Sequence, residues 1–584
     1  MAKYFLGVLS GLLLAFFGVI FLVFVAALIS GASGGGPTVA ENTVLNVNLT
    51  GGIPERIATE FSLEFLDGGV QPTLLGLKQA LERAAEDDNI QAVWLRCGGL
   101  GAGWATAQEI RWAIENFRES GKPVIASMQV GGTLDYLVAS PADELYLAPE
   151  GFLDMKGLRA EVTFYKDMFD KLGVELEMEN VGKYKSAVEP YSRTEMSDEF
   201  REVTNVMLDG IYEQFIGMLA KSRGLDESAV RDAIDQGPFL PAEAAQLALV
   251  DGLRYEDQLE ERLKELLELE EFAQLSLSEY MQAQQDLFGA SSENKVAVVY
   301  GVGSIVRGAS QYDPTFGIDV LGSDSFSRTL RDVRDNDDID AVILRINSPG
   351  GDAFASDTMW RDLRLLLDKK PVVVSMSDVA ASGGYYMAMA QGAPVMAYPL
   401  TVTGSIGVFS GKLNLRGLYD KVGLTKDILT RGRFADIDTD YRRLDELERQ
   451  KLREGIEAVY QAFVQKVADA RGTSWDEIHE VAQGRVWLGT QAEQNGLIDE
   501  LGGFDAALAL VKEEAGIDAD TDVQLLSYPA PKTLFEQLTE SNPLIFEPKA
   551  PSWLSDDLKS AAPGLPALVS GGILALAPYW LNVQ

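Results

Sequence analysis

Residues 338–345 read Asp-Ile-Asp-Ala-Val-Ile-Leu-Arg, and residues 89–96 read Asn-Ile-Gln-Ala-Val-Trp-Leu-Arg. Three more pairs of segments resemble each other in the same order: 122–128 and 370–376, 170–174 and 420–424, and 249–253 and 497–501. The four offsets are 249, 248, 250 and 248 residues. Because both order and spacing hold, the chain contains an internal repeat, and we expect two copies of one structural unit.

Each unit alternates short apolar runs with stretches of helical periodicity. In the second unit the apolar runs predict strands at 296–300, 341–346, 371–376 and 395–397, and the periodic stretches predict helices at 356–367, 383–390 and 442–471. This alternation predicts an α/β fold with a largely parallel sheet in each unit. We place the first repeat at 44–290, the second repeat at 295–527 and a tail of unknown role at 528–584, with a charged helical segment at 257–275.

Charge and residue usage exclude several classes of function. The net charge is -38, from 50 basic and 88 acidic residues, and a field of that sign repels nucleic acid. The chain has one cysteine, Cys97, so an intrachain disulfide or a cysteine zinc site is impossible, and we expect a buried thiol. The single histidine, His479, lies in a polar helical stretch, where we expect a surface residue. A Ser-His-Asp site is therefore not expected, and a nucleophilic serine would need another base.

The N-terminus carries an apolar stretch at 5–30 without any charge. A helix of that length, at about 1.5 Å per residue, spans a hydrocarbon core of about 30 Å. A cleaved signal peptide is the alternative, but its apolar region is normally about 7–15 residues long. We therefore expect a retained transmembrane anchor, with Lys3 on the cytoplasmic side and the body on the other side of the membrane.

The strongest candidate for chemistry is Ser382, in the sequence Asp-Val-Ala-Ala-Ser-Gly-Gly-Tyr-Tyr at 378–386. It follows a predicted strand, where α/β proteins place their functional groups, and the next two glycines leave its hydroxyl open. At an offset of 248 residues, Ser382 corresponds to Leu134, so the first repeat lacks the serine.

The candidate base, Lys185, lies in the first repeat. At an offset of 250 residues it corresponds to Ala435, so the second repeat lacks the lysine. Each repeat has thus lost what the other has kept, which predicts one composite site built from both halves. Lys183 is the neighbouring alternative for the base.

Four motifs together resemble the signal peptide peptidase A family, also called protease IV, in its long two-repeat form. They are Asn-Ser-Pro-Gly-Gly at 347–351, Ala-Ala-Ser-Gly-Gly-Tyr at 380–385, Thr-Gly-Ser-Ile-Gly at 403–407 and Tyr-Lys-Ser-Ala-Val-Glu-Pro at 184–190. The resemblance implies two tandem Clp protease/crotonase-like repeats after a transmembrane helix, and a Ser-Lys dyad in which Lys185 is preferred over Lys183. It also implies a homotetramer in the bacterial inner membrane, with its catalytic body in the periplasm, that degrades cleaved signal peptides.

The expected chemistry is that of a serine endopeptidase without cofactor or metal. A lysine serves as a base only when neutral, so the surroundings of Lys185 must be dry enough to lower its pKa from about 10.4. Ser382 would then attack the scissile carbonyl while Lys185 takes the proton. We expect the backbone N–H groups of Gly351 and Gly383 to form the oxyanion hole, and Ser405 to orient the lysine.

Two alternatives to the peptidase remain open on the sequence. One is a crotonase-type acyl-thioester enzyme, which uses oxyanion donors without a nucleophile. The other is a non-catalytic membrane scaffold of the same fold. An active-serine probe separates all three, because only the peptidase is expected to react through Ser382.

Overall fold

The computed structural model describes residues 37–57, 72–284, 292–313, 318–531, 573–576 and 582–583. The expected anchor at 5–30 lies outside these ranges. Among the helices within them, none combines the length and the apolar character that crossing a membrane requires.

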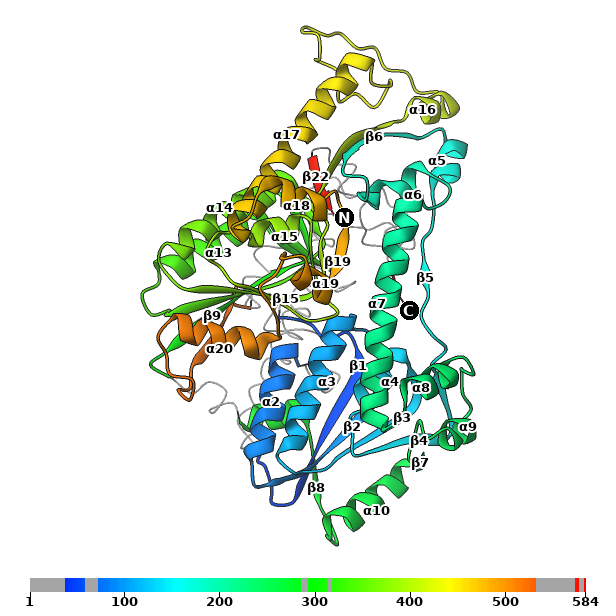
Figure 1. Cartoon of the computed structure of the whole chain (residues 1–584), viewed down its shortest axis with the longest axis vertical. Helices are drawn as coiled ribbons and strands as arrows, with labels where there is room; N and C mark the ends of the chain where they lie inside the picture. Colours follow the sequence, from blue (N-terminus) through cyan, green and yellow to red (C-terminus); the bar gives the residue numbers. More distant parts are fainter. Residues whose placement is uncertain are drawn as a thin grey trace, which may run out of the picture.

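The first repeat is built on a parallel sheet of six strands, seen at the bottom of Figure 1. In spatial order these are β7 (Gly252–Leu253), β4 (Glu144–Asp154), β3 (Val124–Gly132), β2 (Ile90–Leu100), β1 (Thr43–Gly51) and β8 (Ala273–Ser276). The helices of this repeat that follow or connect these strands include α2 (Leu74–Glu86), α3 (Trp104–Glu119) and α4 (Thr133–Ala139). Cys97 is buried in the resulting core, as expected.

The second repeat has a matching sheet, which confirms the α/β class with two tandem repeats. Its order is β19 (Val486–Leu488), β17 (Val402–Gly404), β15 (Val372–Ala381), β13 (Ala341–Ser348), β9 (Lys295–Val302) and β21 (Gln524–Tyr528), and β16 (Val395–Ala397) pairs with β15 and β20 (Glu500–Leu501). Its helices include α13 (Ser323–Asp335), α14 (Ala353–Leu367), α15 (Gly383–Ala388), α18 (Trp475–Val481), α19 (Gly489–Gln494) and α20 (Phe504–Glu514). The expected strands and helices of this repeat all appear, with boundaries shifted by a few residues.

A third sheet of seven strands crosses the boundary between the repeats. Its order is β11 (Gln311–Asp313), β12 (Ile318–Gly322), β10 (Ser304–Val306), β14 (Gly350–Asp352), β22 (Ile573–Leu576), β18 (Val408–Asn414) and β6 (Glu175–Val181). Strand β6 belongs to the first repeat and pairs antiparallel with β18 over seven residues, from Val181 opposite Val408 to Glu175 opposite Asn414. A two-stranded pair joins β23 (Asn582–Val583) to β5 (Ala160–Glu161).

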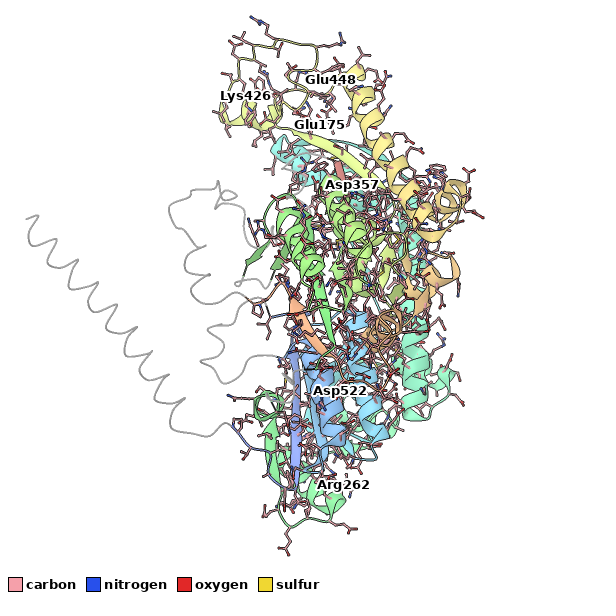
Figure 2. The ribbon with its side chains drawn as sticks, turned by 90° about the vertical axis from the view of Figure 1, so that its left-hand side faces the viewer. Glu175, Arg262, Asp357, Lys426, Glu448 and Asp522 are labelled. Atoms are coloured by element: carbon pink, nitrogen blue, oxygen red, sulfur yellow. The ribbon has the colours of Figure 1, made fainter. Side chains whose placement is uncertain are left out.

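Helices related by the repeat lie on both halves. The 26-residue helices α7 (Asp198–Arg223) and α17 (Glu446–Arg471) correspond to each other, as do α5 (Lys166–Leu172) and α16 (Arg416–Val422). The first repeat also holds η2 (Ser186–Val188), α6 (Glu189–Ser192), α8 (Glu227–Ile234), α9 (Pro241–Gln246), α10 (Glu256–Leu267) and α11 (Leu277–Ala283). Figure 2 shows the elongated body from the side, with Lys426 and Glu448 near one end and Arg262 near the other.

One expected element is wrong at its C-terminal end. The charged segment at 257–275 is helical only to Leu267, where α10 ends at Glu268 in the left-handed region with φ +56°. Residues Ala273–Ser276 instead form β8, because their backbone pairs in parallel with Thr43–Asn46 of β1. The charge spacing at 257–267 is typical of a helix, and it does not indicate that the residues after it form a strand. The partner strand β1 lies far away in the sequence, so no local pattern predicts the pairing.

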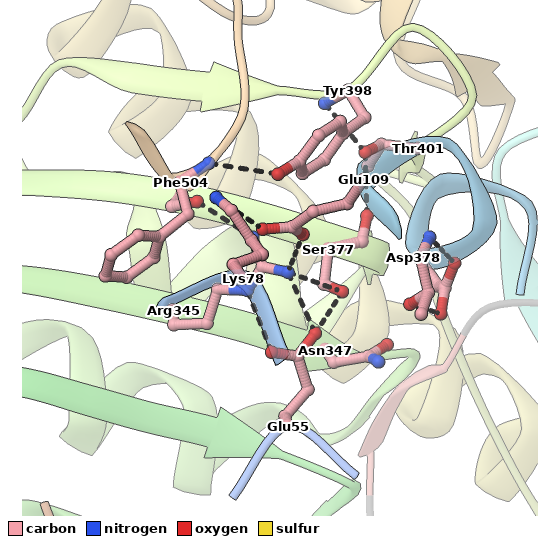
Figure 3. Close-up of polar contacts among 12 residues, drawn as sticks. Glu55, Lys78, Glu109, Arg345, Asn347, Ser377, Asp378, Tyr398, Thr401 and Phe504 are labelled. Carbon is pink, nitrogen blue, oxygen red and sulfur yellow. Dashed lines mark hydrogen bonds and ion pairs between the residues drawn. The ribbon is translucent and has the colours of Figure 1, made fainter. Parts of the chain in front are cut away.

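A buried ion network fixes the two repeats against each other (Figure 3). The guanidinium of Arg345, on β13, contacts both carboxylate oxygens of Glu55 at 3.0 Å and Glu109 Oε2 at 2.7 Å. It also donates to Ser375 and Ser377. Both acidic residues belong to the first repeat, so every ion pair of Arg345 crosses the boundary.

Opposite charges in this network offset the burial of Glu109 and Arg345. Desolvation alone would raise the pKa of Glu109, but Arg345 and Lys78 outweigh it and hold that pKa below its usual value. Desolvation likewise opposes the charge on Arg345, and Glu109 and Glu55 reverse that effect. Lys78 Nζ lies 3.3 Å from Glu109 and 2.6 Å from Asp505, which extends the network to α20.

We expect Arg345→Leu to lower the free energy of unfolding by roughly 3–5 kcal/mol, because it leaves Glu55 buried without its cation and Glu109 with Lys78 as its only cation. Urea unfolding followed by tryptophan fluorescence measures the change. The matched control is Arg364→Leu, which removes the half-exposed Arg364–Asp368 pair and should change the free energy by less than about 1 kcal/mol. Equal losses in both variants would contradict the assigned role of the network.

Candidate active site

Ser382 lies between β15 and α15, in a sharp turn with φ +54° and ψ -114°. A non-glycine residue in this region is strained by about 1–3 kcal/mol, and such strain gathers at functional sites. The turn is held from both sides: Ser382 N–H donates to Gly404 O at 2.7 Å, and Ser382 O accepts from Tyr386 N–H at 2.8 Å. The hydroxyl therefore has a defined position at the carboxyl end of the strand.

Lys185 reaches this turn from the other repeat. It follows β6, whose pairing with β18 carries the chain across the boundary. Tyr184 N–H then donates to Gln483 O at 2.9 Å, and the backbone of Lys185 packs on Gly484. A Cβ built on Gly484 would lie 2.6 Å from Lys185 N, so this close approach requires a glycine at that position.

The structure brings the two expected residues into direct contact. Lys185 Nζ lies 2.7 Å from Ser382 Oγ, and also 3.0 Å from both the carbonyl oxygen and Oγ of Ser405. All three residues are buried, with exposed fractions of 2%, 0% and 0% for Lys185, Ser382 and Ser405. A neutral lysine amine has two N–H bonds and one lone pair. The three contacts satisfy a neutral amine if its two N–H groups donate to the two oxygens of Ser405 and the Ser382 hydroxyl donates to its lone pair.

Burial lowers the pKa of Lys185 well below its usual value, and desolvation is the cause. Among the groups that shift the pKa of Lys185, no carboxylate is present to restore the charge. This contrasts with Lys78, whose pKa is raised because Glu109 and Asp505 outweigh its burial. The environment thus favours the neutral form that a general base needs.

Ser405 lies where the sequence predicts a residue that orients the lysine. It directly follows β17 and, like Ser382, has a positive φ, +54°. Its N–H donates to Arg485 O at 2.7 Å. Its carbonyl and hydroxyl oxygens both contact Lys185 Nζ. Lys183, the alternative base, is exposed, and its Nζ lies over the ring of Tyr184.

Gly351 and Gly383 lie beside each other next to Ser382. A Cβ built on Gly383 would lie 3.0 Å from Gly351 N and 2.6 Å from Ser356 Oγ. Gly351 has φ +157°, and a Cβ there would come within 2.0 Å of Ile305 O on β10. Neither position accepts a side chain, and the lack of one lets the two glycine backbones lie this close to each other and to their neighbours. These are the two glycines that the sequence predicts as oxyanion donors.

The position that corresponds to Ser382 in the first repeat lines a cavity instead. Leu134 and Asp135 form part of a cavity of about 950 Å³ between the repeats, which also touches Asn347 and Pro349. The carboxylate of Asp135 accepts hydrogen bonds from the backbone N–H groups of Gly99 and Leu100. These two residues lie in the first-repeat turn that corresponds to the Asn-Ser-Pro-Gly-Gly motif of the second repeat.

His479, on α18, was expected at the surface but is half-buried. Its ring stacks on Trp475 and forms a hydrogen bond with Tyr460 Oη.

One strand beside this site was not predicted from the sequence. The tail at 528–584 was expected to have no known role, yet its residues Ile573–Leu576 form strand β22 directly beside Gly351. The available signal was weak, because Ile-Leu-Ala-Leu is a short apolar run inside a longer apolar stretch. Nothing in such a run identifies the strand edge that will pair with it.

The chain is similar in sequence to one family of known proteins. The model of the family described as Peptidase family S49 matches residues 116–270 and 364–518. The "Serine protease SPPA, chloroplastic" of Arabidopsis thaliana is 35% identical over 500 residues, covering 85% of this chain and 72% of that protein. The "Protease 4" of Haemophilus influenzae is 31% identical over 529 residues, covering 86% and 84%. A solved structure of a ClpP1 mutant from Listeria monocytogenes aligns with a TM-score of 0.24 at 15% identity, covering 38% and 98%.

The lowered pKa of Lys185 has a testable effect on stability. Between that pKa and 10.5 the unfolded chain binds a proton that the folded chain does not, so stability increases with pH across this window. We expect Lys185→Met to remove this increase and to raise stability near pH 7. Urea unfolding midpoints between about pH 6 and pH 10 measure it.

The control for this prediction is Lys183→Met, which replaces an exposed lysine two residues away. It should keep the pH dependence of the parent protein. A parent-like pH dependence in Lys185→Met as well would show that Lys185 is charged in the folded state.

Proposed function

The chain belongs to peptidase family S49 and is a serine-type peptidase, and from this premise we propose that Ser382 is its nucleophile and Lys185 its general base. The observation that carries the proposal is the 2.7 Å contact between Lys185 Nζ and Ser382 Oγ, across the boundary between the repeats. Membership in a peptidase family argues against both a crotonase-type enzyme and a non-catalytic scaffold.

In the proposed reaction the two residues act in sequence. Lys185 takes the proton of the Ser382 hydroxyl as Oγ attacks the scissile carbonyl. The resulting ammonium then protonates the leaving amine, and the neutral lysine activates the water that hydrolyses the acyl-enzyme. The two acceptors on Ser405 hold Lys185 Nζ in place through both steps and stabilise the transient ammonium by hydrogen bonds.

Gly351 and Gly383 are the proposed oxyanion donors. Their adjacent backbones have no side chains that would keep a carbonyl oxygen away. One N–H from each glycine, fixed before the substrate arrives, stabilises the negative charge of the tetrahedral intermediate. The repeat boundaries at 44–290 and 295–527 then assign the base to the first repeat and the nucleophile with its oxyanion donors to the second.

The proposed substrates are cleaved signal peptides and other apolar peptides at a membrane. We propose a single-pass protein of the bacterial inner membrane, anchored by residues 5–30, with its catalytic body in the periplasm, that assembles as a homotetramer. The support is the apolar N-terminal stretch together with the family motifs around Ser382 and Lys185. Apolar side chains next to the lysine, including Ala187, Val188 and Tyr191, suit such a substrate.

Active-site labelling tests the dyad. We expect a fluorophosphonate probe to label the parent protein, Ser382→Ala to abolish labelling, and Lys185→Met to slow it about 10²–10⁴-fold, because the serine loses its base. Gel fluorescence over time measures the rates. Lys183→Met is the matched control and should label at the parent rate. Parent-rate labelling of Lys185→Met would exclude Lys185 as the base.

Peptide hydrolysis tests the substrate class. We expect a synthetic signal peptide with a leucine-rich core to be cleaved, and a peptide of equal length with alternate leucines replaced by aspartate to be cleaved at least about tenfold more slowly, because buried charges oppose binding in an apolar site. Mass spectrometry of the products over time gives rates and cleavage positions. Equal rates for the two peptides would contradict an apolar substrate.

A further inference from the structure

Strand β22 fills a slot in the third sheet. It lies between β14 and β18 and pairs antiparallel with both: Gly350, Gly351 and Asp352 face Leu576, Ala575 and Leu574, and Phe409 and Ser410 face Leu574 and Ile573. Strand β14 contains Gly351, one of the two proposed oxyanion donors, and β18 follows closely after Ser405. Figure 1 shows β22 in red in the upper part of the molecule, among strands that are distant from it in the sequence. The slot therefore binds an extended backbone from both sides.

The carbonyl group of Ala575 lies at the proposed oxyanion hole. Its oxygen would be 2.2 Å from a Cβ built on Gly350 and 3.0 Å from one built on Gly383. Gly383 N lies 2.5 Å from that built Cβ position on Gly350. The carbonyl oxygen of Ala575 and the amide nitrogen of Gly383 therefore both lie close to one point beside Gly350. Of the three residues of β22 whose side chains are described, Ala575 is thus the one whose carbonyl adjoins these glycines.

The side chains of β22 alternate between two apolar environments. Ala575 is fully buried in the core of the second repeat, where a methyl group occupies the available position. Leu574 and Leu576 point to the other side and join a cluster with Val188, Tyr191 and Phe409, next to Lys185. Because both faces of the strand are buried, a peptide in this slot is selected by the size of its side chains on each face.

We propose that β22 occupies the position of a bound peptide substrate, with Ala575 as the residue whose carbonyl faces Ser382. The inference rests on the proposed function, and it specifies the substrate further. The slot takes an extended apolar peptide with a small residue at the Ala575 position and leucine-sized residues on either side. Because β22 is attached to the same chain, it competes with added peptides at a high effective concentration.

The binding test uses the full chain with Ser382→Ala, so that no turnover interferes. A fluorescent peptide with the sequence of residues 570–579 (Ser-Gly-Gly-Ile-Leu-Ala-Leu-Ala-Pro-Tyr) is the probe. Adding Leu574→Asp and Leu576→Asp places two carboxylates in the apolar cluster and should expel β22. We expect the probe to bind this variant about tenfold or more tightly than it binds Ser382→Ala alone, by fluorescence anisotropy.

Two controls make the binding result specific. Leu429→Asp with Leu447→Asp changes exposed leucines and should leave probe binding as in Ser382→Ala alone. A probe with phenylalanine in place of Ala575 should lose about tenfold or more in affinity, because the fully buried position has no space for a ring. If the aspartate pair unfolds the chain, judged by circular dichroism, Ala575→Phe in the chain itself provides a second way to expel β22.

Fluorophosphonate labelling of chains that keep Ser382 distinguishes a failure of the β22 proposal from a failure of the proposed peptidase function. If β22 occupies the substrate position, the Leu574→Asp/Leu576→Asp variant should label about tenfold or more faster than the parent. Equal labelling rates, or equal probe affinity with and without β22 expelled, would overturn the inference and leave the proposed function intact. Absence of labelling in every chain would overturn the proposed function itself.

Discussion

A lysine buried without an acidic partner is the constraint on which the rest of this structure depends. Desolvation lowers the pKa of Lys185 well below its usual value, and the residues that bury this lysine come from both repeats. The contact with Ser382 therefore exists only while the repeats stay in register. Pairing of β6 with β18 and the network around Arg345 provide that register, one through backbone hydrogen bonds and the other through buried ion pairs.

Much of the fold and the core of the site follow from the repeat. Four matching segments predict two parallel α/β units, and the loss of serine from one copy and lysine from the other predicts that Ser382 and Lys185 meet. The structure has both units and a direct contact between the two side chains. These features are predictable because local periodicity and aligned residue identities are written in the sequence itself.

What the sequence does not predict depends on contacts between distant segments. Arg96 and Arg345 occupy matching positions in the repeat, yet Arg96 pairs with the exposed Glu256 whereas Arg345 is buried against Glu55 and Glu109. Residue identity alone cannot separate these environments, since burial arises only once the repeats associate. The same holds for β22, whose pairing partners β14 and β18 lie more than 150 residues earlier in the chain.

One short loop of the second repeat, residues 483–485, supports both Ser405 and the backbone of Lys185. Ser405 has a positive φ, and its N–H is bound by Arg485 O. Gln483 O, two residues before Arg485, binds Tyr184 N–H, and Gly484 packs on Lys185 between them. A single segment thus positions both the lysine and the serine that orients it. Because Lys185 and Ser405 both contact this backbone, the loop contributes to the close packing that desolvates Lys185 and fixes Ser405, whose two oxygens offset the cost of burying the amine.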